Sequence, residues 1–158
     1  MSHDIDVFEA APTSSVALAL LQAAHDAMKA HYPRKWDIEF DPRSFALADA
    51  SIFLACLSGK AVGCCALFLR PDFAELKKLH VAPASRGFGV AEALVGYAEA
   101  FAQATGSRKI MLESGARLHA AHRLYSRLGY QPCGAFGTHT PDPDSCFFEK
   151  DLQRLDDR

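Results

Sequence analysis

The sequence predicts an α/β (α+β) fold in which a mixed central sheet of about six to seven strands is flanked by helices. Two observations predict this fold. Three apolar, β-compatible runs follow one another with only short turns between them, at residues 51–57, 61–69 and 73–81, which indicates a meander of antiparallel strands. Beyond them, helical and strand patterns alternate along the chain, so both kinds of element are expected to share one core.

The segment before the meander is predicted to hold one strand and one helix. Residues 4–10 alternate polar and apolar side chains, as a strand with one buried face does. Residues 12–15, Pro-Thr-Ser-Ser, supply helix-capping chemistry, and apolar residues then recur at helical spacing in a helix that ends near His31. Residues 32–50 show no sustained period, so we expect an irregular loop that can contain a helix.

The third strand of the meander contains an irregularity. Leu79 and Val81 share one face of an ideal strand, whereas Leu76 falls on the other, because side chains alternate with a period of two. A bulged residue near Lys77 or Lys78 would return Leu76 to the apolar face. Burial of both faces accounts for the same pattern, so both interpretations stand.

The second half of the chain is predicted to alternate helices and strands. Helical periodicity covers residues 89–105 and 119–128, and strand patterns occur at 109–113, near 130–136 and at 146–151. A chain of 158 residues is long enough for one core and too short for two ordinary ones. We therefore expect a single domain spanning residues 1–158.

The composition is that of a folded globular protein, with 49% hydrophobic and 23% charged residues. The formal net charge of -2 produces no long-range field that would attract nucleic acid or an anionic membrane, so neither is expected as a partner. The N-terminus lacks a basic segment followed by an apolar stretch, and no apolar run approaches the roughly 20 residues that span a bilayer. The expected location is the cytoplasm.

The five cysteines are expected to be buried, reduced thiols. Their number is odd, no Cys-x-x-Cys pair occurs, and the neighbours Cys64 and Cys65 point to opposite faces of a strand. Neither has a base beside it in the sequence, which gives no support to a nucleophilic role.

A glycine-rich turn leads from the third meander strand into the next helix. Gly87 and Gly89 lack side chains where a ligand would approach, and the helix offers its first N–H groups and the positive end of its dipole. With the charge of Arg86, these features suit a pyrophosphate, although a sharp turn without a ligand accounts for the glycines as well. A Rossmann site fits less well, because residues 82–85 intervene and Glu92 stands at the spacing of the third glycine.

Two motifs resemble the GNAT family of N-acetyltransferases. The strand and turn resemble that family's acetyl-CoA signature and read Leu76-x-x-Leu79-x-Val81-x-Pro83-x-x-Arg86-Gly87-x-Gly89-x-Ala91. A second motif is similar to the family's last strand and helix and reads Leu112-Glu113-Ser114-Gly115, then Ala121-x-x-Leu124-Tyr125-x-x-x-Gly129-Tyr130. The ending resembles an uncharacterised bacterial branch and reads Pro143-x-Ser145-x-Phe147-x-Glu149-Lys150.

The resemblance implies the GNAT acyl-CoA N-acyltransferase fold, with splayed central strands, and acetyl-CoA as the acetyl donor; no metal is expected. The pantetheine arm would pair with the backbone of Leu79, His80 and Val81. The pyrophosphate would be bound by consecutive backbone N–H groups, those of Arg86, Gly87, Phe88, Gly89, Val90 and Ala91. Leu118 departs from the family, because many members have an asparagine there that contacts the cofactor.

Tyr125 and Glu75 are the candidate catalytic residues. Tyr125 lies on the apolar stripe of its helix, as a core tyrosine also would, and the resemblance implies that it protonates the departing CoA thiolate. Glu75 resembles a strand glutamate that serves several members as general base, directly or through a water, and burial is expected to raise its pKa. A solvated glutamate or a partner of Lys77 is the alternative, and Glu113 is the reserve base.

The expected activity is direct transfer of an acetyl group from acetyl-CoA to a primary amine in a ternary complex, with a small-molecule amine as acceptor. The backbone N–H of Leu79 is the implied oxyanion donor. Aromatic residues and one later segment are candidates to shape the acceptor pocket, namely Trp36, Phe40, Phe45 and residues 137–144.

Other interpretations remain open. A non-catalytic acyl-CoA-binding regulatory module would keep the glycine turn without depending on Tyr125 or Glu75, and a Rossmann-like oxidoreductase would bind a nicotinamide nucleotide instead. His119 and His122 have the i, i+3 spacing of metal ligands, but further ligands are not apparent. The sequence leaves a homodimer open.

Overall fold

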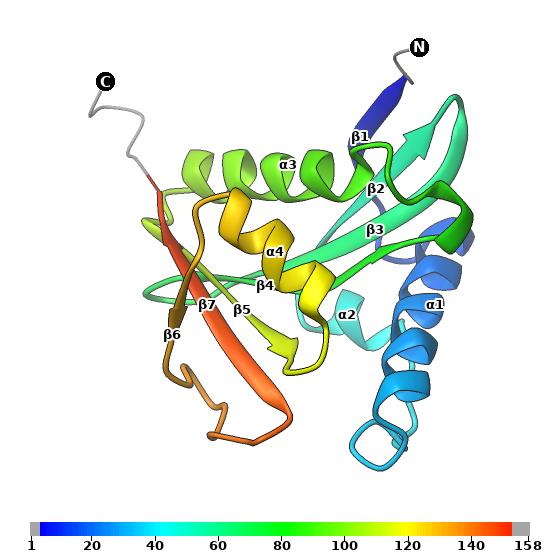
Figure 1. The fold of residues 1–158 in the computed structure, drawn as a ribbon. Coiled ribbons are helices and arrows are strands. Elements are labelled where there is room, and N and C mark those ends of the chain that lie inside the picture. Colours follow the sequence, from blue (N-terminus) through cyan, green and yellow to red (C-terminus); the bar gives the residue numbers. More distant parts are fainter. Residues whose placement is uncertain (1–3, 153–158) are drawn as a thin grey trace. The chain divides into compact units, whose positions relative to one another are not determined.

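The computed structural model describes residues 4–152 and contains seven strands and four α-helices (Figure 1). The elements of the first half are β1 (Ile5–Ala10), α1 (Ser15–His31), α2 (Ser44–Leu47), β2 (Ser51–Leu57), β3 (Lys60–Leu69) and β4 (Ala74–Val81). Those of the second half are a short 3₁₀ helix (Pro83–Ser85), α3 (Val90–Ala104), β5 (Lys109–Gly115), α4 (His119–Arg127), β6 (Gln131–Cys133) and β7 (Ser145–Asp151).

The strands form one mixed sheet in the order β1-β2-β3-β4-β5-β7-β6. β1 pairs with β2 and β2 with β3 in antiparallel orientation, and the β2–β3 pairing is the one that the meander predicts. β4 and β5 run parallel, and β7 pairs antiparallel with both β5 and β6. The predicted mixed α/β fold with six to seven strands and flanking helices is confirmed.

Contacts divide the chain into two compact units. The first combines residues up to Phe68 with Lys78–Ala98, and the second combines Leu69–Lys77 with the residues from Glu99 onward. The boundary passes through β4 and α3, which are continuous elements of the chain. The expectation of one domain over residues 1–158 stays a prediction.

In the first unit, helices pack on both faces of β2 and β3. Residues of α1 cluster with the even-numbered core residues of these strands, whereas Phe53 and Cys65 on the other face contact α3. The α1 members of this cluster are Ala17, Leu21 and Ala24, and the strand members are Ile52, Leu54, Cys64, Ala66 and Phe68. Because helices cover both faces of β2 and β3, both strands have continuous apolar runs in their sequences.

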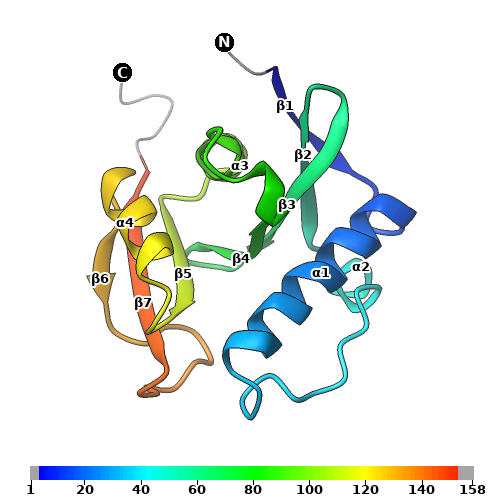
Figure 2. The ribbon, with the colours of Figure 1, turned by 45° about the vertical axis from the view of Figure 1, so that its right-hand side comes forward.

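In the second unit, α4 lies along β5 and β7 (Figure 2). Tyr125 and His122 of α4 both contact Phe148 of β7, with ring centroids 5.7 and 5.2 Å apart. A second aromatic cluster, built on Met111, Phe136 and Phe147, packs against Phe73. These contacts hold the loop after β6 against β5 and β7.

Element ends differ from the sequence prediction in two places. β6 covers only Gln131–Cys133, because the chain leaves the ladder at Gly134 and the expected strand residues 134–136 form a loop. β5 continues to Gly115, where it pairs with Ser145 of β7. The extra residues of β5 satisfy their backbone groups against a partner strand that lies 30 residues later in the chain, a pairing that local periodicity does not reveal.

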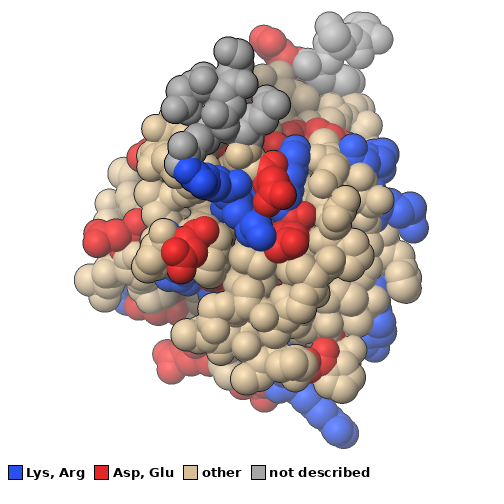
Figure 3. Space-filling model, turned by 90° about the vertical axis from the view of Figure 1, so that its left-hand side faces the viewer, with Lys and Arg blue, Asp and Glu red and all other residues tan. Residues whose placement is uncertain are grey.

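The surface carries charges of both signs. On the face drawn in Figure 3, Lys and Arg side chains lie beside Asp and Glu side chains. Ion pairs between side chains of opposite charge include Lys109 with Glu149 at 3.2 Å and Lys150 with Glu99 at 2.8 Å. Among residues 4–152, no helix combines the length and the apolar character that a membrane-spanning helix requires.

Candidate active site

The glycine-rich turn has a backbone that glycine adopts without strain. Gly87 has φ +85° and Gly89 has φ +88°, values in the left-handed region. Among the residues that the structure describes, a Cβ atom added at Gly87 would meet nothing within 4 Å, and one at Gly89 would meet only the Ile5 side chain, at 3.8 Å. The two glycines are therefore explained by backbone conformation, and the outer side of the turn is open to a ligand.

The electrostatics of this turn favour an anion. α3 begins at Val90, directly after the turn, and its first N–H groups carry the positive end of the helix dipole. Arg86 is exposed, and its Nε donates a hydrogen bond of 3.1 Å to the carbonyl of Val81, which fixes the base of the guanidinium at the turn. The residues present fit a pyrophosphate group.

The end of β4 contains the predicted irregularity. Lys78 has φ +58°, whereas the parallel register with β5 covers Ala74–Leu76. Leu76 and Val81 are buried, but so are Ala74 and Glu75, so the burial pattern fits both the bulge and the burial of both faces. His80 is half-buried, and burial lowers its pKa, with a smaller contribution from the charge of Arg86.

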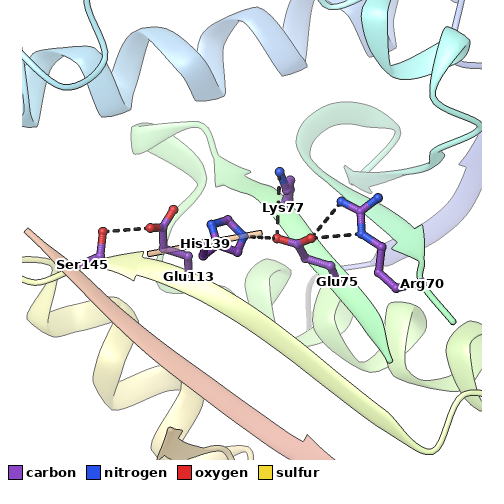
Figure 4. A network of polar contacts seen from close by, with 6 residues as sticks. All are labelled: Arg70, Glu75, Lys77, Glu113, His139 and Ser145. Atoms are coloured by element: carbon purple, nitrogen blue, oxygen red, sulfur yellow. Dashed lines mark hydrogen bonds and ion pairs between the residues drawn. The ribbon is translucent and has the colours of Figure 1, made fainter. Parts of the chain in front are cut away.

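Glu75 lies at the start of β4, within a polar network of the second unit (Figure 4). Its side chain is 4% exposed. Arg70 donates two hydrogen bonds to Oε1, at 2.9 and 3.2 Å, and His139 lies 2.7 Å from Oε2. Lys77 is a weaker partner at 3.9 Å, so the pairing with Lys77 that was the alternative to a base role is one part of a larger network.

The expected rise in the pKa of Glu75 is wrong. Burial by itself raises the pKa of this carboxyl, but hydrogen bonds from His139 and Arg70 and the charge of Lys77 outweigh burial and lower it. The carboxylate is thus ionised and weakly basic. The sequence shows the burial of this strand but not its partners, because His139 lies 64 residues away.

His139 is a functional candidate that sequence reasoning missed. The only signal was its position in residues 137–144, the segment proposed to shape the acceptor pocket. Glu113, the reserve base, accepts a hydrogen bond of 2.8 Å from Ser145. Figure 4 shows both carboxylates, with Ser145 and His139 among their neighbours.

Tyr125 occupies the inward stripe of α4, as the periodicity predicts. It is 6% exposed and packs against Tyr130 as well as Phe148. Gly129, with φ +91°, follows the helix at the expected C-cap. The position fits a proton donor or a core tyrosine equally, and its catalytic role stays a prediction.

The two histidines before Tyr125 differ in environment. His119 is exposed, whereas His122 is half-buried and bonds the carbonyl of Gly115 through Nε2 at 2.8 Å. Within the described part of the chain, no group of three or more potential ligands could hold a metal ion. The i, i+3 spacing therefore needs no metal to explain it, because the imidazole of His122 bonds the backbone at the end of β5.

Two of the loop aromatics surround a lysine of the first unit. The Lys78 ammonium lies 4.8 Å from the ring centroid of Trp36 and 4.4 Å from that of Phe40, and 3.3 Å from Nδ1 of His25. Phe40 in turn stacks on His25, and Phe45 packs on Phe68. Phe40 and Phe45 thus pack against the core, and Trp36 lies edge-on to His25. A role of these three aromatics in an acceptor pocket stays a prediction.

All five cysteines are free thiols, but only Cys64 and Cys65 are buried, so the expected burial is wrong for the half-buried Cys56, Cys133 and Cys146. Burial raises the pKa of Cys64 to about 12 and raises that of Cys65 well above its usual value. Both thiols are therefore protonated near neutral pH and cannot act as nucleophiles.

Comparison with known proteins places the chain in a family. The model of the Acetyltransferase (GNAT) family matches residues 18–130. An IAA acetyltransferase of Azospirillum brasilense is 28% identical over 151 residues, which cover 94% of this chain and 99% of the relative.

Solved structures agree with this match. A candidate acyl-CoA N-acyltransferase of Klebsiella pneumoniae is 34% identical and has a TM-score of 0.75, with coverage of 94% of this chain and 98% of that one. A GNAT family acetyltransferase of Elizabethkingia anophelis, solved with acetyl-CoA bound, is 15% identical, with a TM-score of 0.71 and coverage of 94% and 98%. The match to the GNAT family model therefore gives no support to the alternative of a Rossmann-like oxidoreductase.

Proposed function

Because the chain belongs to the acetyltransferase (GNAT) family, we propose that it transfers an acetyl group from acetyl-CoA to a primary amine by direct attack in a ternary complex. One observation carries the proposal beyond family membership. The turn at Arg86–Ala91 has two glycines in the left-handed region and an open outer side, directly before the N-terminus of α3.

The acetyl donor would bind through backbone groups. The N–H groups of Arg86, Gly87, Phe88, Gly89, Val90 and Ala91 would receive the pyrophosphate, and Leu79, His80 and Val81 would pair with the pantetheine arm. When bound, acetyl-CoA supplies a thioester whose carbonyl carbon accepts the amine. The backbone N–H of Leu79 would stabilise negative charge on the carbonyl oxygen.

The chain must also accept and donate a proton. An amine that attacks the thioester loses a proton, and the departing thiolate gains one. The network centred on Glu75 serves as the proton-accepting group, and the Tyr125 hydroxyl serves as the donor. A small-molecule amine is the proposed acceptor, and the relative of Azospirillum brasilense is named an IAA acetyltransferase.

Thermal unfolding with added ligands tests the donor. Acetyl-CoA is expected to raise the melting temperature, because a ligand that binds the folded state alone stabilises it. A shift with NADPH and none with acetyl-CoA would contradict the proposal. A panel of amines, read by the release of free thiol, then identifies the acceptor, and binding without turnover on any amine would favour the regulatory module.

A pair of glycine variants tests the site itself. Gly87→Ala and Gly106→Ala both place a Cβ at positive φ, at +85° and +94°, with no atom within 4 Å. Each is expected to destabilise the protein by about 1 kcal/mol. Only Gly87→Ala is expected to weaken acetyl-CoA binding, by about tenfold or more, because its Cβ faces the approaching pyrophosphate. Equal acetyl-CoA affinities in a titration would place the donor elsewhere.

Tyr125→Phe tests the proton donor. The substitution retains the ring that packs on Tyr130 and Phe148 but removes the hydroxyl. We expect unchanged acetyl-CoA affinity and a kcat lowered by about 10²-fold, since general acid catalysis contributes about 10²–10⁴-fold. Turnover equal to that of the wild type on the identified amine would assign Tyr125 to the core alone.

A further inference from the structure

Both oxygens of the Glu75 carboxylate are already engaged. Arg70 donates two hydrogen bonds to Oε1, while His139 contacts Oε2 at 2.7 Å. With only 4% of the side chain exposed, an incoming amine has little access to either oxygen. A carboxylate stabilised in this way is a poor proton acceptor, so the proton-accepting atom of the network lies elsewhere.

The contact with Glu75 determines the tautomer of His139. An ionised carboxylate has no proton to donate, so Nε2 of His139 must carry one and donate it to Oε2. In the neutral ring, Nδ1 then holds a lone pair. Within the described part of the chain, no hydrogen-bond partner is found for Nδ1, and the side chain is 21% exposed, five times as much as that of Glu75.

The imidazole is also fixed in position. The ring of Phe136 lies 4.9 Å away in an edge-on arrangement, and that of Phe147 lies 5.9 Å away. The backbone N–H of His139 donates to the carbonyl of Phe136 at 3.0 Å. An apolar wall and one bonded nitrogen leave the opposite nitrogen as the reactive atom, which is the arrangement of a carboxylate-oriented histidine base.

We propose that Nδ1 of His139 is the atom that takes the proton of the acceptor amine, and that Glu75 is a positioning residue that orients the imidazole through Nε2. The inference rests on the proposed function. As the nitrogen–carbon bond of the amide forms, the carbon–sulfur bond of the thioester breaks. The surplus proton of the amine passes to Nδ1, the thiolate takes the Tyr125 proton, and solvent restores both groups.

The charged groups around His139 support its role as a base. Glu75 is the ionised side chain in direct contact with His139. Arg70 and Lys77 are cations that pair with the same carboxylate. The other neighbours, Phe136 and Phe147, carry no charge. The imidazolium that forms on proton transfer is therefore stabilised by the carboxylate beside it.

Two matched glutamine variants separate the two candidate bases. His139→Gln retains an amide that can reach Glu75 but has no basic nitrogen, and Glu75→Gln retains an acceptor oxygen for His139 but no charge. In the full chain, with acetyl-CoA and the amine identified by screening, we expect His139→Gln to lower kcat/KM by about 10²–10³-fold. Glu75→Gln is expected to lower kcat/KM less.

Two further measurements keep the test independent of folding. His139→Gly is expected to regain activity with added imidazole, and ¹⁵N spectra of the wild-type imidazole are expected to show the proton on Nε2. His119→Gln, at an exposed histidine, serves as the control and is expected to match the wild type. An undiminished rate in His139→Gln, a larger loss in Glu75→Gln, or a proton on Nδ1 would overturn the inference while the acetyltransferase activity stands. A wild-type protein that acetylates no amine would instead overturn the proposed function and the base role with it.

Discussion

At the residue scale, Lys78 combines two opposing contributions to stability. Its φ of +58° is unfavourable for a residue with a side chain. Its ammonium lies over the rings of Trp36 and Phe40, which contributes about 0.5–2 kcal/mol. The side chain therefore offsets the strain of the backbone that carries it.

Substitutions at Lys78 separate these contributions. Lys78→Ala loses the ammonium and keeps the strain, whereas Lys78→Gly loses the ammonium and relieves the strain. We expect the glycine variant to be more stable than the alanine variant by about 1 kcal/mol in urea unfolding. Lys77 lacks a positive φ, so Lys77→Ala is expected to be more stable than Lys77→Gly. Equal stabilities of Lys78→Ala and Lys78→Gly would show that the positive φ of residue 78 carries no strain.

The irregularity at Lys78 was predictable, whereas the network at Glu75 was not. Leu76, Leu79 and Val81 break the period of two, and Lys78, one of the two residues at which a bulge was expected, has a positive φ. The pKa of Glu75 depends on His139, which no local pattern connects to it. Burial is readable from neighbours in the chain, but the partners that decide a pKa come from remote segments.

At the element scale, the start of α3 packs closely on β3 at Gly63. A Cβ atom there would lie 3.0 Å from the carbonyl oxygen of His80, 3.1 Å from Leu94 Cδ1 and 3.2 Å from Val90 Cγ1. The backbone of β4 and two side chains of α3 thus both approach Gly63. The position of the α3 N-terminus, which the proposed donor site uses, depends on this absent side chain.

Two glycine-to-alanine variants test this contact. Gly63→Ala is expected to destabilise the protein by about 1–3 kcal/mol, because the surrounding atoms must move. Gly96→Ala, at an exposed site within α3 where a Cβ meets nothing within 4 Å, is expected to stabilise it by about 0.5–1 kcal/mol. Urea unfolding measures both. A Gly63→Ala variant as stable as the wild type would show that α3 can shift without penalty.

Local patterns predicted most elements because their determinants are local. The side chain of Ser14 accepts a hydrogen bond from the Ala17 N–H, and Ser58 and Gly59, both with positive φ, form the two-residue hairpin turn. β6 and β5 were less well predicted, since their ends depend on pairing with β7. The Tyr125 helix was placed correctly, but its chemistry is not a property of its periodicity.

At the scale of the whole molecule, three ionisable groups give stability the same dependence on pH. The pKa values of His25 and His80 are lowered, with burial as the main cause, and the pKa of Glu75 is lowered by its hydrogen bonds in spite of burial. In each case the unfolded chain binds a proton at a higher pH than the folded chain does. Acidification therefore favours the unfolded state.

We expect the free energy of unfolding to fall in two stages on acidification. The contribution of the histidines is present above their usual pKa of 6.5 and is lost as the pH falls through their lower folded pKa values. That of Glu75 is present above 4.5 and is lost as the pH falls through its lower folded pKa. Urea unfolding at intervals from about pH 7.5 to about pH 3.5 measures both stages.

Variants assign the two stages to their groups. His25→Phe retains a ring that can stack on Phe40 but cannot titrate, so the loss of stability in the first stage is expected to become smaller. Glu75→Gln is expected to flatten the second stage only. His31→Gln, at an exposed histidine at the end of the same helix as His25, is the control for removing an imidazole. Wild-type stability that stays constant or rises on acidification from about pH 7.5 to about pH 5.5 would contradict the buried, neutral state of His25. A histidine that titrates alike in the folded and unfolded states leaves stability independent of pH.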